Sequence, residues 1–349
     1  MPDFPPYSVA IATRNRASAL QLSLPRILAQ TIAPAQIVIV DSSDDALEVP
    51  DITHSAARLF QGDLQIFRGE KGLTRQRNAA LARVDAPITF FPDDDSIWFP
   101  DTAERILEAY RADSGLNIAA VCAKESKIPP PDFDGSCSGG YESTIAQKLR
   151  RTVAIERRML EKFLAPNPLD ILGKRFISEC HPVKNEEDTT PVAYMTGFRM
   201  SFRTEVIRQF GFDETLTNYS LNEDIDASFH AWRFGRVVAA QKALVFHHRA
   251  PGARDNGFTL GVTGMLNVAY VISKHAPPGD ASRAAFERYF WYRMSLYTLG
   301  ITTRFGRDRF LGARTALPLA RKLAKTPPSE ARDSYISAIA SLSSSTTRQ

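Results

Sequence analysis

The amino-acid sequence predicts an α/β fold, in which a mostly parallel sheet is flanked by helices and followed by a helical C-terminal region. Three observations support this class. Strand and helix signals alternate over the first ~120 residues, which is typical of a parallel sheet with crossover helices. Three strand-like segments end in polar clusters. After about residue 257 the chain has the apolar spacing of amphipathic helices.

The strands and helices of the first half are predicted in chain order. Residues 7–13 (YSVAIAT) and 36–40 (QIVIV) are apolar enough to be buried strands, and residues 64–68 form a short third strand. The segment between the first two carries Leu20, Leu24 and Ile27 on one helical face. A helix follows over 72–83, then an apolar strand at 87–92, a helix from about 100 to 111 and a strand at 117–123.

The pattern changes in the second half. Residues 125–190 contain loop signals and a basic amphipathic helix at 144–164, so we expect an insertion or lid there. Regular structure returns at 192–202, with helices near 204–210 and 223–234 and a strand at 243–246. We expect one domain over residues 1–256 and a helical region over 257–349 with a frayed tail.

Composition describes an ordinary globular protein of 349 residues, 44% of them hydrophobic and 23% charged. The net charge of +4 is too balanced to indicate a nucleic-acid partner. We expect no signal peptide, since the N-terminus lacks an apolar stretch, and no membrane-spanning helix. The three cysteines have no metal-type spacing, and reduced thiols in a cytoplasmic protein are the simplest account.

The most informative feature is the acidic run Asp93-Asp94-Asp95, which closes the strand at 87–92. Open α/β sheets bind ligands at the carboxyl ends of their strands. Carboxylates this close together repel each other, and a divalent cation with oxygen ligands relieves the repulsion. A solvated turn before a helix explains the three acids equally well, so the surroundings decide.

Two other strands end in polar clusters, Thr13-Arg14-Asn15-Arg16 and Asp41-Ser42-Ser43. In a parallel sheet these ends line one crevice with the acidic run. Arginines beside a metal site suit a diphosphate, because both neutralise its oxygens. Asp41 is placed to accept hydrogen bonds from a base or ribose, although a turn cap is an equally common role for Asp.

The order of these pieces resembles the family 2 glycosyltransferases, which have the GT-A fold with a Rossmann-like sheet. The resemblance covers about residues 7–250 and is specific because several signals occur in the family's order. The matching stretches are VAIATRNR (9–16), VIVDSS (38–43), GLTRQRNAAL (72–81), FPDDDSIWFP (91–100), GFRMSFRTEV (197–206), GFDETL (211–216) and NEDIDASFHAWRFG (222–235).

The resemblance implies a divalent metal, Mn²⁺ or Mg²⁺, and a nucleotide-diphospho-sugar donor. Asp93 and Asp95 correspond to the family's Asp-x-Asp pair, with Asp95 the direct metal ligand and Asp93 the contact to ribose or diphosphate through the metal. A histidine at the end of the strand at 243–246 completes the metal shell, and His247 is favoured over His248. The donor contacts are completed by Thr13, Arg14, Asp41, Asp94, Arg254, and the Arg-Asn match on the donor-side helix, taken as Arg75 and Asn78.

The resemblance assigns the general base to Asp224, in the family's Glu-Asp motif. This residue lies near the start of an amphipathic helix, where carboxylates are favoured by the helix dipole. Asp226 is a lesser candidate. In this role Asp224 takes the proton of an acceptor hydroxyl as its oxygen attacks the anomeric carbon, and a single in-line displacement inverts the configuration.

The function predicted is therefore a metal-dependent inverting glycosyltransferase, in bacterial surface polysaccharide or glycolipid synthesis, with a glycan or lipid-linked acceptor. The chain lacks the Gln-x-x-Arg-Trp motif of the family's processive synthases, which favours transfer of a single sugar. A peripheral contact with the inner face of a membrane and a homo-oligomer are left open. The alternatives are a non-catalytic nucleotide- or glycan-binding partner and a sugar nucleotidyltransferase, although the latter needs a glycine-rich loop after the first strand.

Overall fold

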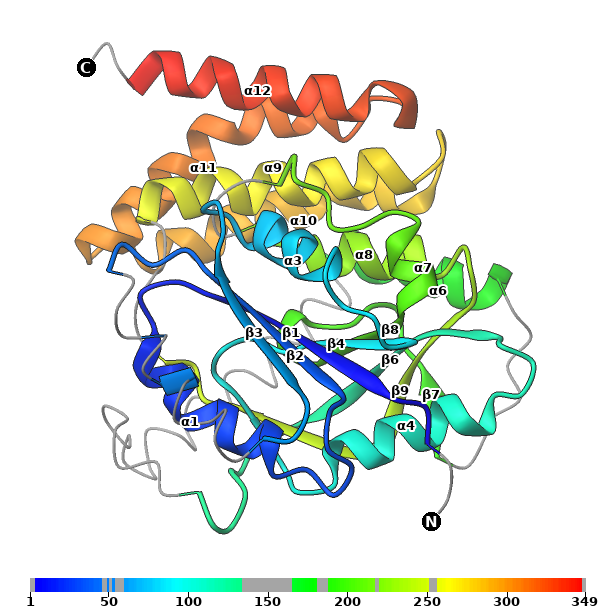
Figure 1. Ribbon diagram of the computed structural model, residues 1–349. Coiled ribbons are helices and arrows are strands. Elements are labelled where there is room, and N and C mark those ends of the chain that lie inside the picture. Colours follow the sequence, from blue (N-terminus) through cyan, green and yellow to red (C-terminus); the bar gives the residue numbers. More distant parts are fainter. Residues whose placement is uncertain are drawn as a thin grey trace. The chain divides into compact units, whose positions relative to one another are not determined.

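The computed structural model describes residues 4–45, 49, 52–53, 60–133, 165–180, 188–216, 220–250 and 256–346 (Figure 1). The chain divides into two compact units, Met1–Phe133 with Phe176–Arg254, and Asp134–Arg175 with Asp255–Gln349. The predicted helix at 144–164 and Arg254, a predicted donor contact, lie outside the described residues. The predicted domain limit at residue 256 stays a prediction.

The first unit is built on one nine-stranded sheet with the order β3-β2-β1-β4-β8-β6-β9-β5, and β7 pairs with β9. It is parallel from β3 to β4 and antiparallel where β8 joins β4 and β6. The strands are β1 (Tyr7–Thr13), β2 (Gln36–Asp41), β3 (Asp63–Arg68), β4 (Ile88–Phe91), β5 (Ser96–Trp98), β6 (Ile118–Ser126), β7 (Thr189–Pro191), β8 (Met200–Arg203) and β9 (Arg236–His247).

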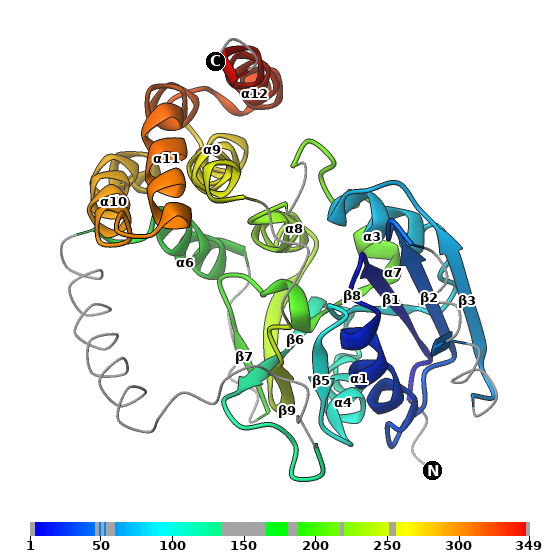
Figure 2. The ribbon, with the colours of Figure 1, turned by 90° about the vertical axis from the view of Figure 1, so that its left-hand side faces the viewer.

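Helices cover both faces of this sheet. Figures 1 and 2 show α1 and α4 on one face and α3, α7 and α8 on the other. The two central strands β1 and β2 are consequently buried along almost their whole length, whereas β3 at the edge is half-buried. The helices of this unit are α1 (Ala17–Leu28), α3 (Leu73–Leu81), α4 (Thr102–Ala112), α7 (Thr204–Arg208) and α8 (Glu223–Ala231), with a short 3₁₀ turn, η1 (Gly197–Arg199).

The predicted fold class is confirmed: a central sheet is flanked by helices, and helices follow toward the C-terminus. Two local details differ from the sequence analysis. Residues 96–98, to which the sequence analysis assigns no element, form β5 and pair with the end of β9. β9 begins at Arg236 rather than near 243, because the alanines at 239 and 240 weaken the strand signal of a segment that pairs with β6 and β7.

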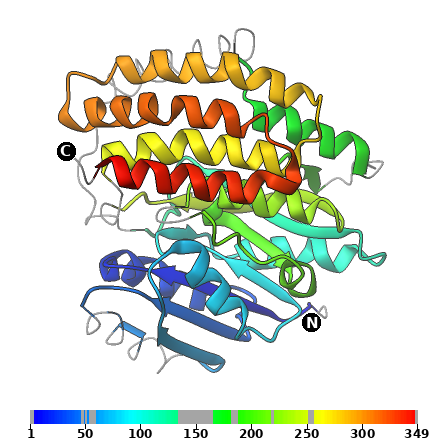
Figure 3. The same ribbon diagram turned by 90° about the horizontal axis from the view of Figure 1, so that it is seen from above.

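The second unit is helical. Its helices are α9 (Gly257–His275), α10 (Ala281–Thr298), α11 (Arg304–Leu323) and α12 (Ala331–Thr346), with a short 3₁₀ turn, η2 (Pro328–Glu330), and α6 (Pro168–Cys180) crosses the boundary between the units. Figure 3 shows α10 and α11 side by side. Glycines bring the backbones of α9 and α11 close together, since a Cβ added at Gly261 would lie 2.7 Å from the Ala313 nitrogen. No helix among the described residues is long and apolar enough to cross a membrane.

Candidate active site

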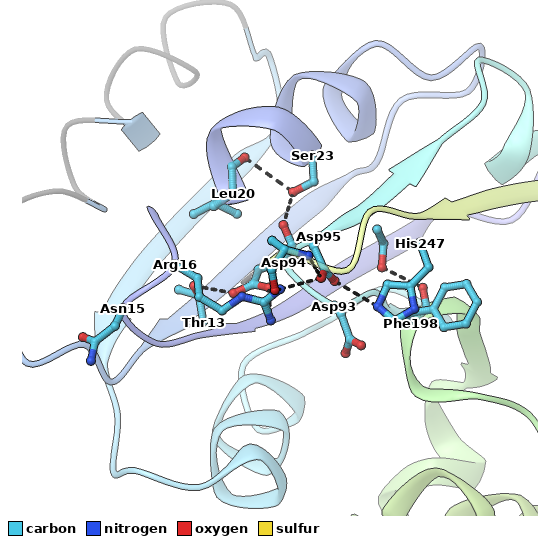
Figure 4. Close-up of polar contacts among 12 residues, drawn as sticks. Thr13, Asn15, Arg16, Leu20, Ser23, Asp93, Asp94, Asp95, Phe198 and His247 are labelled. Carbon is cyan, nitrogen blue, oxygen red and sulfur yellow. Dashed lines mark hydrogen bonds and ion pairs between the residues drawn. The ribbon is translucent and has the colours of Figure 1, made fainter. Parts of the chain in front are cut away.

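The three consecutive aspartates form a tight turn between β4 and β5. Asp93 forms a parallel bridge with Ala12 next to the end of β1, and its carbonyl accepts a hydrogen bond from the Ser96 amide at 3.0 Å. The turn sends the three side chains in different directions, as Figure 4 shows. The aspartates therefore have different surroundings and are treated separately below.

Asp94 is turned into the protein. Its carboxylate accepts a hydrogen bond from Thr13 Oγ1 at 2.8 Å and pairs with Arg16 Nη1 at 3.0 Å, and its carbonyl accepts one from Ser23 Oγ at 2.7 Å (Figure 4). Burial raises the pKa of this carboxyl to about 7, although Arg16 and Thr13 oppose the change. Asp94 thus connects the aspartate turn to β1 and α1.

Asp95 lies between Arg16 and His247 (Figure 4). Its Oδ2 pairs with Arg16 Nη2 at 2.5 Å and accepts a hydrogen bond from the Ala250 amide at 3.0 Å. Its Oδ1 is 3.4 Å from His247 Nε2. Burial alone would raise the pKa of Asp95, but His247 and Arg16 lower it to about 2, so the carboxylate is charged at neutral pH.

Asp93, Asp95 and His247 form a candidate metal site, because one ligand atom from each lies within 4.8 Å of the others. Stacking on Phe198, with 4.4 Å between ring centroids and 14° between planes, holds the His247 ring. Asp95 Oδ1 is buried without a hydrogen bond among the described residues. Two carboxylates and an imidazole together suit Mn²⁺, and the two carboxylates also suit Mg²⁺. This donor set therefore fits the predicted ion.

Arg77 connects this cluster to the start of α8. Its side chain is 2% exposed, and its guanidinium pairs with Asp93 Oδ1 at 2.8 Å and with Glu223 Oε1 at 2.6 Å. It also donates to the Gly197 carbonyl at 3.3 Å and lies over the Phe212 ring at 5.2 Å. One buried cation therefore joins residues from the Asp-x-Asp and Glu-Asp stretches.

Asp224 is the second residue of α8, whose N-cap Asn222 adopts a left-handed conformation with φ of 72°. Its Oδ1 accepts a hydrogen bond from the Ile225 amide at 2.8 Å, and its Oδ2 accepts one from the Gly197 amide at 2.9 Å. The side chain is half-buried, in contrast to buried Glu223. Burial raises the pKa of Asp224, and burial together with the Asp224 charge raises the pKa of Glu223 to about 8.

The chain is similar to known glycosyltransferases in sequence and in fold. A family model described as glycosyl transferase family 2 matches residues 8–152. The predicted resemblance to family 2 glycosyltransferases is confirmed. An uncharacterized glycosyltransferase of Nostoc, alr2836, is 30% identical over 113 residues, which are 32% of this chain and 34% of that protein. The chain thus spans about a third of the length of this curated relative.

Solved structures resemble nearly the whole chain. A mannosyltransferase from Pyrobaculum calidifontis, in complex with GDP-Man and Mn²⁺, has a TM-score of 0.51 at 15% identity and covers 97% of this chain and 87% of its own. S. aureus TarS 1-349 with UDP has a TM-score of 0.53 at 16% identity, and the match covers 97% of this chain and 92% of the TarS chain. GalNAc-T7 with UDP, GalNAc and Mn²⁺ has a TM-score of 0.54 at 15% identity, and the match covers 98% of this chain and 58% of GalNAc-T7. At these identities the likeness shows the fold, and the predicted GT-A fold is confirmed.

Other predicted donor residues have partners within the protein. Asp41 is buried, and its carboxylate accepts hydrogen bonds from the Ser43 amide at 2.8 Å and from Arg68 Nη1 at 3.0 Å. Arg14 pairs with exposed Asp44 at 3.2 Å. These contacts give both residues a role in the loops that follow β1 and β2, and their contact with a donor stays a prediction.

The sequence analysis missed Arg77 and chose its neighbours on α3. Arg75 is half exposed and pairs with Glu70 at 3.0 Å. Asn78 is held by the Phe212 backbone, with its Nδ2 donating to the carbonyl and its Oδ1 accepting from the amide, both at 2.8 Å. The adjacent Arg77-Asn78 dipeptide was the signal that could have identified Arg77.

The structure also separates two pairs of alternatives. His247 faces Asp95, whereas the His248 ring packs against Phe133 with 5.7 Å between centroids. Asp226, the lesser candidate for the base, is buried and lies 4.0 Å from His230 Nε2. Asp224 is the more exposed of the two acids. It accepts a hydrogen bond from the Gly197 amide, and Arg77 donates one to the Gly197 carbonyl.

Proposed function

We propose that this protein is a metal-dependent inverting glycosyltransferase that moves one sugar from a nucleotide-diphospho-sugar to an acceptor hydroxyl. The observation that carries the proposal is the cluster of Asp93, Asp95 and His247, connected through Arg77 and Glu223 to the half-buried Asp224. The acceptor is a glycan or a lipid-linked glycan, and the process is bacterial surface polysaccharide or glycolipid synthesis.

In this mechanism Asp93, Asp95 and His247 would hold the divalent ion, and a bound ion would supply positive charge for the diphosphate leaving group. Arg16 helps to lower the pKa of the Asp95 carboxyl and orients it, and Arg77 orients the Asp93 carboxylate. Asp41 contacts the nucleotide, with Thr13, Arg14, Asp94, Arg75, Asn78 and Arg254 as the other predicted donor-side residues.

Asp224 acts on the acceptor. Its carboxylate takes the proton of the acceptor hydroxyl while that oxygen forms a bond to the anomeric carbon, and the bond from this carbon to the diphosphate oxygen breaks. The Gly197 and Ile225 amides hold the carboxylate in place during this transfer. Attack opposite to the leaving diphosphate inverts the anomeric configuration.

The first experiment is a thermal-shift screen of UDP, GDP and dTDP, each with Mn²⁺ and with EDTA. A nucleotide that binds only the folded protein raises its stability according to the ratio of its concentration to its dissociation constant, so the preferred base stands out. Transfer from the corresponding nucleotide-sugars to glycan and lipid-linked acceptors then tests the reaction, and the configuration of the product tests inversion.

Two variants test the assignment of roles. Asp95→Ala removes a metal ligand and should abolish Mn²⁺-dependent turnover, whereas Asp224→Asn should retain nucleotide binding and lose transfer. Asp85→Asn, on the exposed end of the segment before β4, is the matched control. Full Mn²⁺-dependent turnover in Asp95→Ala would refute the metal site, and full transfer in Asp224→Asn would move the base elsewhere.

A further inference from the structure

Exposed apolar side chains concentrate on the hairpin formed by α10 and α11. Within the described part of the chain, five of the nine strongly exposed large apolar residues fall between 291 and 311: Trp291, Leu299, Ile301, Phe305 and Leu311. Leu299 is 79% exposed and Trp291 57%. Several large apolar side chains exposed on one hairpin are of the kind that marks an interaction surface, whereas single exposed apolar residues need no explanation.

Helical spacing arranges these residues into stripes that also carry arginines. On α10, Arg288, Trp291, Ser295 and Leu299 follow one another at intervals of three or four residues and are all exposed, so they share one face. On α11, Arg304, Arg307, Leu311 and Arg314 do the same. Ile301 lies in the connection between the two helices, and Phe305 lies in the first turn of α11.

The charge of the hairpin is strongly positive. Residues 288–325 contain nine Lys or Arg and one Asp, a net charge of +8, although the whole chain has only +4. Among the described residues, no carboxylate forms an ion pair with Arg288, Arg304, Arg307 or Arg314. By contrast, Arg321 pairs with Glu287 at 2.7 Å, on the contact between the two helices. The exposed arginines are therefore available to an anionic partner.

We propose that the α10–α11 hairpin rests on an anionic lipid surface. Its Trp, Phe, Leu and Ile side chains enter the interfacial region, and its arginines remain at the level of the lipid phosphates. Interleaved arginines and apolar residues suit this surface, because the lipid supplies negative charge and an apolar layer side by side. A second copy of the same hairpin would bring its uncompensated positive charge against another, which opposes self-association through this face.

The inference deepens the proposed function, and rests on it only in that a lipid-linked acceptor would be found at such a surface. Binding to lipid requires neither donor nor transfer, so the two proposals fail separately. The Asp224→Asn variant should bind vesicles as the wild type does, and Trp291→Ser should keep the stabilisation by nucleotide and Mn²⁺.

The test is co-sedimentation of the full chain with vesicles of phosphatidylcholine alone and of phosphatidylcholine with phosphatidylglycerol. We expect binding to the anionic vesicles only, and a decrease with added salt. Arg304→Gln with Arg307→Gln should weaken binding about 30-fold, since each basic residue at such a surface contributes roughly 1 kcal/mol. Trp291→Ser with Leu299→Ser should weaken it at least 10-fold through lost apolar burial.

Matched controls alter exposed residues elsewhere. Arg83→Gln with Arg111→Gln removes the same charge from the first unit, and Ile336→Ser removes an apolar side chain that is 49% exposed on α12. Both should bind vesicles like the wild type. Absence of vesicle binding, equal binding to neutral vesicles, or a wild-type dimer that Trp291→Ser converts to a monomer would each overturn the proposal.

Discussion

The Arg77 guanidinium lies 2.6 Å from the Glu223 carboxylate, and the two residues, 146 positions apart in the chain, are both buried. The same guanidinium reaches Asp93 at 2.8 Å. A buried arginine with two carboxylate partners costs much desolvation and holds both partners in one geometry. The candidate metal ligand and the helix that carries the candidate base are thus positioned by one side chain.

Replacing Arg77 should impair both metal binding and transfer. Arg77→Met leaves Glu223 without its buried partner, so we expect the free energy of unfolding to fall by about 3–5 kcal/mol. Arg77→Lys keeps the charge but lacks the planar fork that reaches two carboxylates. We expect it to fold, with Mn²⁺ affinity and kcat each lowered at least 10-fold.

Urea unfolding, calorimetric Mn²⁺ titration and transfer kinetics measure these effects, and Arg83→Lys is the control, since Arg83 is exposed and is not among the predicted site residues. A purely structural role would lower stability without changing the Mn²⁺ affinity of the folded protein. Wild-type affinity and turnover in Arg77→Lys would therefore contradict the positioning role.

The two consecutive histidines should differ in their effect on the metal. His247 lies 3.4 Å from Asp95, whereas His248 packs against Phe133. We expect His247→Ala to raise the dissociation constant for Mn²⁺ at least 10-fold and His248→Ala to leave it unchanged, as measured by calorimetry. EDTA should abolish transfer, and added Mn²⁺ should restore it. Equal effects of the two substitutions would remove His247 from the site.

The rate of transfer should fall in mild acid because of Asp224. Burial raises the pKa of this carboxyl, and a general base acts only when deprotonated. The rate at saturating donor should therefore be full above the raised pKa and fall as the pH decreases through it, at a higher pH than for an ordinary aspartate. The residual rate of Asp224→Asn should lack this acidic limb. If the acidic limb of the pH–rate profile persists in this variant, the limb belongs to a group other than Asp224.

The sequence predicted the fold and the elements of the site because both rest on local signals. Apolar runs identify β1, β2 and β4, and the polar clusters at their ends fall at one edge of the sheet. Arg77 escaped prediction for a physical reason: an arginine on a short helix looks like a solvated charge, and only the fold shows that carboxylates at positions 93 and 223 surround it. The inward turn of Asp94 is likewise a tertiary property, since it depends on Arg16 and Thr13.

Gly197 provides the last prediction, because the network around Arg77 leaves little room for a side chain there. A Cβ at this position would lie 3.2 Å from both Arg77 Nη2 and Glu223 Oε1. These two atoms belong to buried side chains that hold each other, so neither moves away without lengthening an ion pair. The Gly197 amide also donates to Asp224 at 2.9 Å.

We therefore expect Gly197→Ala to lower the free energy of unfolding by about 1–3 kcal/mol, the usual cost of overpacking, and to lower kcat at least 10-fold. Gly264→Ala in α9 is the control: its Cβ would meet only the Tyr297 hydroxyl, at 3.4 Å, and alanine in a helix interior is favoured over glycine by roughly 0.5–1 kcal/mol. Urea unfolding and transfer kinetics compare the two. Wild-type kcat in Gly197→Ala would mean that Arg77 and Glu223 shift without displacing Asp224, which would separate the ion-pair network from the proton transfer.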